Sequence, residues 1–68
     1  MSHESTLITT LRRRLTIQVA QVERFFRDSP APSYILLEIE DARREIATLK
    51  AQAQRRGETI ADDPLDQA

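Results

Sequence analysis

The segment from Ile35 to Ala53, ILLEIEDARREIATLKAQA, decides the fold of this 68-residue chain. Its apolar positions are spaced in alternating steps of four and three: Ile35, Ile39, Ala42, Ile46, Leu49 and Ala53. This spacing is typical of the a and d positions of a helix that packs against another helix. The pattern covers fewer than three heptads, so it indicates a short packed helix rather than a long coiled coil.

A second amphipathic stretch precedes this segment. Its apolar residues also recur at steps of three and four: Leu7, Ile8, Leu11, Leu15, Val19, Val22, Phe25 and Phe26. At about 100° per residue they fall within an arc of about 120°, which is the stripe of an amphipathic helix. Gln18 lies inside the arc and Ile17 nearly opposite its centre, so these two residues break the pattern. We therefore predict a helix over residues 5–28, with Ser2 or Ser5 as its N-cap.

The two stretches are separated by SPAPS, residues 29–33. A residue before proline is disfavoured in the α region, which predicts a turn over residues 29–32. A second helix is expected over residues 33–56, with Pro32 in its first turn or Ser33 as its N-cap. Gly57 is suited to the position just after this helix. A connection this short favours two antiparallel neighbours, so the predicted fold is an all-α, two-helix hairpin.

The two ends of the chain differ from the helical region in composition. Residues 1–56 carry ten bases and seven acids, a net charge of +3, whereas residues 57–68 carry four acids and no base. We expect residues 1–4 to be disordered and residues 57–68 to form a flexible acidic tail or the start of a linker.

Packing of the two stripes predicts the core and the surface between the helices. The predicted core and interface residues are Leu11, Leu15, Val19, Val22, Phe26, Ile35, Ile39, Ala42, Ile46 and Leu49. Tyr34, Leu36, Leu37 and Ile17 do not all fit on the two facing stripes, which leaves apolar surface to be covered. A two-fold dimer that forms a four-helix bundle would cover it. The competing interpretation is a monomeric hairpin with a thin core.

The second predicted helix carries an acidic cluster, which could in principle be a catalytic or metal site. Its members are Glu38, Glu40, Asp41 and Glu45. Paired carboxylates can act as acid and base or bind a divalent metal. Metal sites in helical bundles use a Glu-x-x-His pattern, and no histidine stands at that spacing here. Acids and arginines three or four residues apart instead predict ion pairs along an exposed helix face. The charges predicted to select a partner are Arg13, Arg14, Glu38, Glu40, Asp41 and Arg44.

Other classes of function are disfavoured by what the sequence contains. The run Arg12–Arg14 points in three directions on a helix and has no interleaved aromatic residue, so nucleic-acid binding is not expected. An enzyme, a metal site or a cofactor is not expected, because the sequence has no cysteine, no glycine-rich phosphate loop and only one histidine. No apolar run is long enough for a membrane span, and the start of the sequence lacks the pattern of a signal peptide. We expect a cytoplasmic protein with a protein partner.

The second half of the chain resembles a helical segment that recurs in bacterial multidomain signalling proteins, of the form P-P-h-I-x-x-E-I-E-D-I-R-x-E-I-x-x-L. The matching residues are Pro32, Ile35, Glu38, Ile39, Glu40, Asp41, Arg43, Glu45, Ile46 and Leu49. In the first helix Arg13, Arg14, Leu15, Gln18 and Ala20 are similar. The segment accompanies NTPase, caspase-like and Toll/interleukin-receptor-like domains, and it is similar to effector-associated or death-like adaptor modules. Ala42 replaces the usual larger aliphatic residue.

The resemblance implies a non-catalytic adaptor that couples sensor and effector through homotypic helical contacts in bacterial conflict or defence signalling. A homodimer or a like hairpin is then the expected partner. The alternative is a stand-alone small regulator, such as a secretion chaperone, docking domain or antitoxin, that binds one unlike protein. Mass in solution separates the two hypotheses, because only the first requires self-association.

Overall fold

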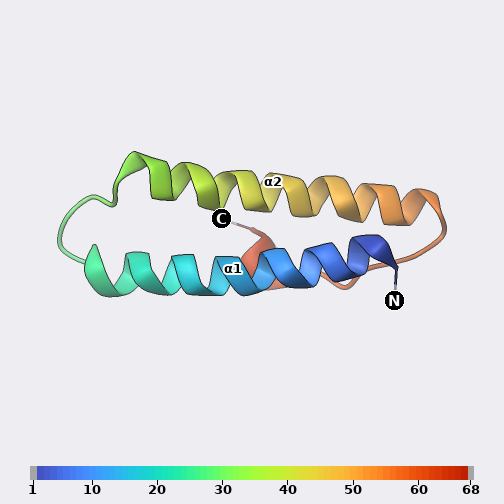
Figure 1. Ribbon diagram of the computed structural model, residues 1–68, viewed down its shortest axis with the longest axis horizontal. Helices are drawn as coiled ribbons and strands as arrows, with labels where there is room; N and C mark the ends of the chain where they lie inside the picture. Colours follow the sequence, from blue (N-terminus) through green and yellow to red (C-terminus); the bar gives the residue numbers. More distant parts are fainter. Residues whose placement is uncertain (1, 68) are drawn as a thin grey trace.

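The computed structural model describes residues 2–67, and within them the chain forms a hairpin of two helices. Helix α1 spans His3–Phe25 and helix α2 spans Ser33–Arg55, and the two lie side by side along a molecule 44 Å long and 16 Å across (Figure 1). A short 3-10 helix, η1, spans Pro64–Asp66. The predicted all-α hairpin is confirmed.

Helix α1 begins earlier than predicted because Ser2 caps it. The Ser2 hydroxyl accepts a hydrogen bond from the backbone N–H of Ser5 at 3.1 Å, which satisfies one of the free donors of the first turn. Residues 3 and 4, predicted to be disordered, are therefore helical. Glu4 is buried and forms an ion pair with Arg56 beyond the end of α2. Residue 1 lies outside the described residues.

The chain reverses over residues 26–32, so α1 ends three residues before the predicted position. Phe26 is the C-cap and donates its backbone N–H to the carbonyl of Val22 at 3.0 Å. Because a residue before proline is disfavoured in the α region, α1 ends upstream of Pro30, and the chain bends over residues 26–29. Pro32 is the residue before α2 and Ser33 its first helical residue, so neither predicted role is correct.

The end of α2 is fixed by the single glycine of the sequence. Gly57 has φ +84°, its backbone N–H binds the carbonyl of Gln54, and the N–H of Glu58 binds the carbonyl of Ala53. These two bonds form a Schellman motif, in which glycine occupies the left-handed position at low cost. The chain therefore turns back sharply after Arg56, one residue beyond the last residue of α2.

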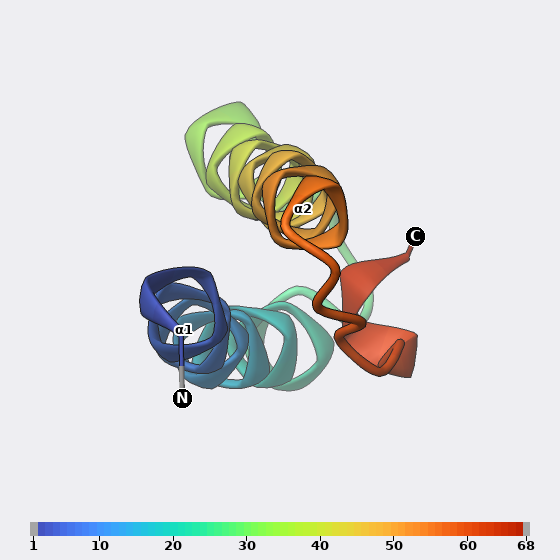
Figure 2. The ribbon, with the colours of Figure 1, turned by 90° about the vertical axis from the view of Figure 1, so that its right-hand side faces the viewer.

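Residues 58–67, here called the C-terminal segment, are folded rather than flexible. After the turn they run back along one side of the helix pair, which is the far side in Figure 1 and the right-hand side in Figure 2, and place η1 against both α1 and α2. Ile60 packs on the core between the helices, and Asp63 caps η1 through a hydrogen bond from the N–H of Leu65 at 2.9 Å. The expectation of a flexible acidic tail is corrected, because acids and apolar side chains of this segment both find partners on the helices. Residue 68 lies outside the described residues.

The core is concentrated in the half of the hairpin away from the turn. Its buried apolar residues are Ile8, Leu11, Leu15, Ile39, Ile46, Leu49 and Ala53. Val19, Val22, Ile35 and Ala42 pack against this core but are only partly buried. The C-terminal segment adds a third layer near the core, whereas the turn end has no such cover. This asymmetry determines which apolar side chains remain exposed.

Candidate interaction surfaces

Most of the predicted core residues lie between the helices. Leu11, Leu15, Ile39, Ile46 and Leu49 are buried, and Val19, Val22, Ile35 and Ala42 flank them. Phe26 is half-buried at the start of the turn. Ile8 at 1% exposure and Ala53 at 0% extend the core toward the end opposite the turn. Both residues belong to the periodic patterns of the sequence.

Three basic side chains from the two helices meet the C-terminal segment. Arg12 of α1 forms a two-pronged contact with the Asp66 carboxylate, with Nε–Oδ1 at 3.0 Å and Nη2–Oδ2 at 2.7 Å. Lys50 of α2 lies 2.5 Å from the same Oδ2. Arg43 of α2 donates its Nε–H to the carbonyl of Leu65 at 3.0 Å. We call Arg12, Arg43 and Lys50 the basic groove.

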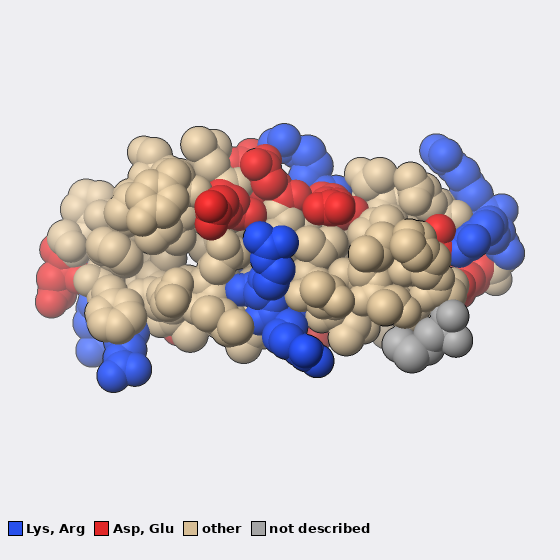
Figure 3. Space-filling model, viewed as in Figure 1, with Lys and Arg blue, Asp and Glu red and all other residues tan. Residues whose placement is uncertain are grey.

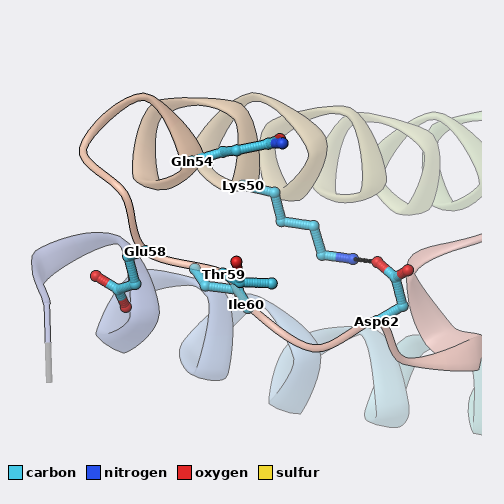
Figure 4. A pocket seen from close by; sticks show the side chains of 6 residues that line it. All are labelled: Lys50, Gln54, Glu58, Thr59, Ile60 and Asp62. Atoms are coloured by element: carbon cyan, nitrogen blue, oxygen red, sulfur yellow. Dashed lines mark hydrogen bonds and ion pairs between the residues drawn. The ribbon is translucent and has the colours of Figure 1, made fainter.

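The basic groove also holds the segment before η1. Arg12 donates to the carbonyl of Ala61 at 2.8 Å, and Lys50 pairs with Asp62 at 2.6 Å. Figure 4 shows Lys50 extending from α2 to Asp62, across a hollow of about 210 Å³ lined also by Gln54 and residues 58–60. Both main-chain carbonyls and carboxylates of the segment are therefore recognised.

Burial and pairing change the proton affinities in this groove. The hydrogen bond from Arg12 lowers the pKa of Asp66 to about 2, and Lys50 adds to the effect, while burial opposes it. The same contact raises the pKa of Arg12. Burial lowers the pKa of Lys50, but its hydrogen bonds to Asp62 and Asp66 outweigh this, and the net pKa is raised. All three groups are therefore charged at neutral pH.

Acid should weaken the fold through Asp66. Its pKa is depressed in the folded chain relative to about 3.9 in the unfolded chain, so its contribution is complete above that value and is lost as the pH falls toward 2. We expect the free energy of unfolding to decrease by about 2 kcal/mol between pH 5 and pH 2 from this group. Urea unfolding at a series of pH values measures it. An Asp66→Asn chain with the same pH dependence as the wild type would contradict this assignment.

Two acids of the acidic cluster, Glu40 and Asp41, pair with Arg44 along α2, as the spacing predicted. Arg44 lies 3.0 Å from Glu40 and 3.5 Å from Asp41, and all three side chains are well exposed. Such pairs contribute only a few tenths of a kcal/mol. Arg43, which stands three residues after Glu40, turns instead to the C-terminal segment. Arg13 and Arg14 are exposed on α1.

One side of the hairpin is free of the C-terminal segment. On it Gln18 of α1 donates a hydrogen bond to Glu38 of α2 at 2.8 Å. Residues at helical spacing from these two share the same side. The resulting tail-free face comprises Arg14, Gln18 and Phe25 of α1 and Tyr34, Glu38 and Glu45 of α2. On the face shown in Figure 3, acids gather over the middle of α2 and bases lie below them over α1. Toward the turn end the surface between the two helices is mostly uncharged, and charged side chains stand at its outer and lower edges.

Large apolar side chains are exposed mainly around the turn end. Phe25 is 64% exposed and Tyr34 65% exposed, and Leu36 and Leu37 in the first turn of α2 are also exposed. Ile17 is exposed further along α1, where it lines a shallow groove of about 400 Å³ with Phe25. The guanidinium of Arg24 lies 5.4 Å from the centre of the Phe25 ring. These residues form an apolar surface that the hairpin itself leaves uncovered.

Two kinds of site are not found among residues 2–67. No group of three or more His, Asp or Glu side chains is arranged to hold a metal ion. Neither helix is long and apolar enough to cross a membrane.

Comparison with known proteins gives no relative. No family model matches the sequence, and no similar protein was found among curated proteins or solved structures. The resemblance to effector-associated and death-like adaptor segments therefore stays a prediction from residues 11–50.

The contacts that the sequence did not predict join residues that are far apart in the chain. Glu4 pairs with Arg56, the Ser2 hydroxyl donates to Glu58 at 2.9 Å, and Arg12 binds Asp66. One local signal was available, because Asp63 and Asp66 have the spacing of a capping box with proline between them. That signal predicts a helical turn in the tail, although it does not reveal the groove to which the turn binds.

Proposed function

We propose that this chain is a non-catalytic interaction module that assembles with a second copy through the tail-free face, forming a four-helix bundle. The observation that carries the proposal is the exposure of Phe25 and Tyr34, two aromatic side chains on one face of the turn end. Exposed aromatic residues are favoured as anchors of protein interfaces, because they bury much apolar area with few rotatable bonds.

The amount of exposed surface supports this proposal. The chain exposes 5139 Å², whereas a compact monomer of 7.8 kDa is expected to expose about 4,400 Å². The difference is close to the roughly 800 Å² that each partner buries in a standard interface. An elongated hairpin therefore has enough surplus surface for one interface of ordinary size.

The charges on the tail-free face favour a second copy over an unrelated partner. A two-fold axis along the length of the hairpin would place α1 of one copy over α2 of the other. Arg14 would then lie over the acidic stretch that contains Asp41 and Glu45, and Phe25 would approach Tyr34 of the other copy. Opposite charges and aromatic rings would meet twice in one symmetric interface.

An adaptor role between sensor and effector in bacterial defence is the wider proposal, and it is supported by the sequence resemblance alone. The alternative of a small regulator with an unlike partner uses the same exposed aromatic side chains. Self-association decides between them, because a chain that stays monomeric at high concentration has no homotypic interface.

Replacing Tyr34 with aspartate should weaken the dimer at least about tenfold, since it removes an aromatic anchor and places charge in the interface. Aspartate is compatible with the first turn of a helix, so α2 should be retained. Light scattering over a concentration series measures the dissociation constant. Leu36→Asp is the matched control, because Leu36 is also an exposed apolar residue in the first turn of α2 but points about 160° away from Tyr34 around the helix. Equal weakening by both substitutions, or a monomeric wild type, would refute the proposed interface.

A further inference from the structure

The C-terminal segment binds the hairpin in the manner of a peptide ligand. Its Asp66 carboxylate is held by Arg12 and Lys50, and its side chain is only 6% exposed. Main-chain carbonyls of Ala61 and Leu65 accept hydrogen bonds from Arg12 and Arg43. Recognition of one carboxylate and two carbonyls fixes both the position and the direction of the segment.

The covalent connection between the segment and the helices is a single tight turn. Gly57 with φ +84° makes this turn, and no atom outside its immediate neighbours lies within 4 Å of where a Cβ would stand. A change of backbone angles near Gly57 would swing residues 58–67 away from their own groove. The groove contacts themselves do not depend on which chain supplies the segment.

We propose that the basic groove is a docking site for the C-terminal segment of a second copy of this chain, so that two chains can exchange residues 58–67. A second copy is the appropriate occupant because this segment already matches the groove in charge, in carbonyl positions and in the placement of Ile60 on the core. Exchange of an identical element keeps the contacts in the groove and changes only the hinge at Gly57, with its capping hydrogen bonds. The proposal concerns the side opposite the tail-free face and does not rest on the dimer proposed above.

Reversal of charge in two separate chains tests the exchange. One chain carries Arg12→Glu and Lys50→Glu, and the other carries Asp62→Lys and Asp66→Lys. Within each chain, groove and segment then repel one another. In a mixture, each groove faces a segment of opposite charge only if the segment comes from the other chain.

Native mass spectrometry of an equimolar mixture should show a ratio of heterodimer to total homodimer about tenfold higher than the ratio that random pairing gives. The two reversed chains carry net charges of −5 and +3, each four units from the wild-type value of −1, so the mixture is measured at about 0.5 M salt, where their overall attraction is screened. Under these conditions a dimer made through the tail-free face alone would pair the two chains at random, so the two proposals give different distributions. If the reversed chains are unfolded on their own, exchange predicts a gain of helicity on mixing, measured by circular dichroism. Random pairing, or no gain of helicity in that case, would overturn the proposal.

A chain with all four substitutions is the control. Its reversed groove and reversed segment attract one another within the same molecule, so it should fold alone. It should form no excess of mixed dimer with the wild type, because its groove repels the wild-type segment. An excess there would mean that charge reversal has created an unrelated contact, and it would also overturn the proposal.

Discussion

A chain with aspartate in place of Ile46 should be unfolded. Ile46 is fully buried at the centre of the α2 seam, with 0% of its surface exposed. An unpaired carboxylate there loses several kcal/mol of hydration, in addition to the apolar contacts of the isoleucine. A domain of this size has only a few kcal/mol of stability, so the loss exceeds what the fold has available. Circular dichroism should show that most of the helical signal is gone at 25 °C.

The neighbouring substitution Ala47→Asp is the control for this experiment. Ala47 is exposed on the same helix, so it receives the same new charge at nearly the same place in the sequence. We expect Ala47→Asp to retain the helical signal and to change the free energy of unfolding by less than about 1 kcal/mol. An Ile46→Asp chain as helical as Ala47→Asp would show that this seam is not the core.

Substitution of Asp66 by alanine should be the most destabilising change in the C-terminal segment. It removes the partner of Arg12 and one partner of Lys50, leaving two partly buried cations less well neutralised. We expect a loss of about 2 kcal/mol, which corresponds to a decrease of about 8 °C or more in the midpoint of thermal unfolding. Thermal unfolding followed by circular dichroism provides the measurement.

Asp62→Ala separates the effect of burial from that of charge. Asp62 also pairs with Lys50, but its side chain is 79% exposed, and exposed ion pairs contribute little. We expect its midpoint to stay within about 3 °C of the wild type. If both alanine variants behave like the wild type, the segment contributes nothing to stability, and its place in the basic groove is refuted.

The helices could be predicted from the sequence because their signals are local and periodic. Ile39, Ile46 and Leu49 stand at seam spacing, and they are buried in the structure. Gly57 follows the last turn of α2 and forms its cap. Prolines in SPAPS require a break, although they did not reveal that the bend begins at residue 26. The prolines predicted the position of the break between the helices. They did not predict its length, because that depends on the backbone bend over residues 26–29.

The basic groove could not be predicted because its parts are charged residues far apart in the chain. Arg12, Arg43 and Lys50 converge only when α1 and α2 are paired in the observed register. In the sequence each resembles an ordinary exposed cation, and the acids near the end resemble a solvated tail. Ile60 and Leu65 were the indication that this tail could dock, because exposing large apolar side chains to water in a freely solvated segment is unfavourable.

The distance in sequence between Arg12 and Asp66 has a consequence for the order of folding. The groove needs side chains from both helices, so it does not exist until the hairpin has closed. The C-terminal segment should accordingly be the last part to fold and the first to be released. Its amide hydrogens should exchange with solvent sooner than those of the seam, through local opening that leaves the helix pair intact. Binding of residues 58–67 in the groove therefore requires that the two helices are paired in the observed register, although these residues lie outside both helices.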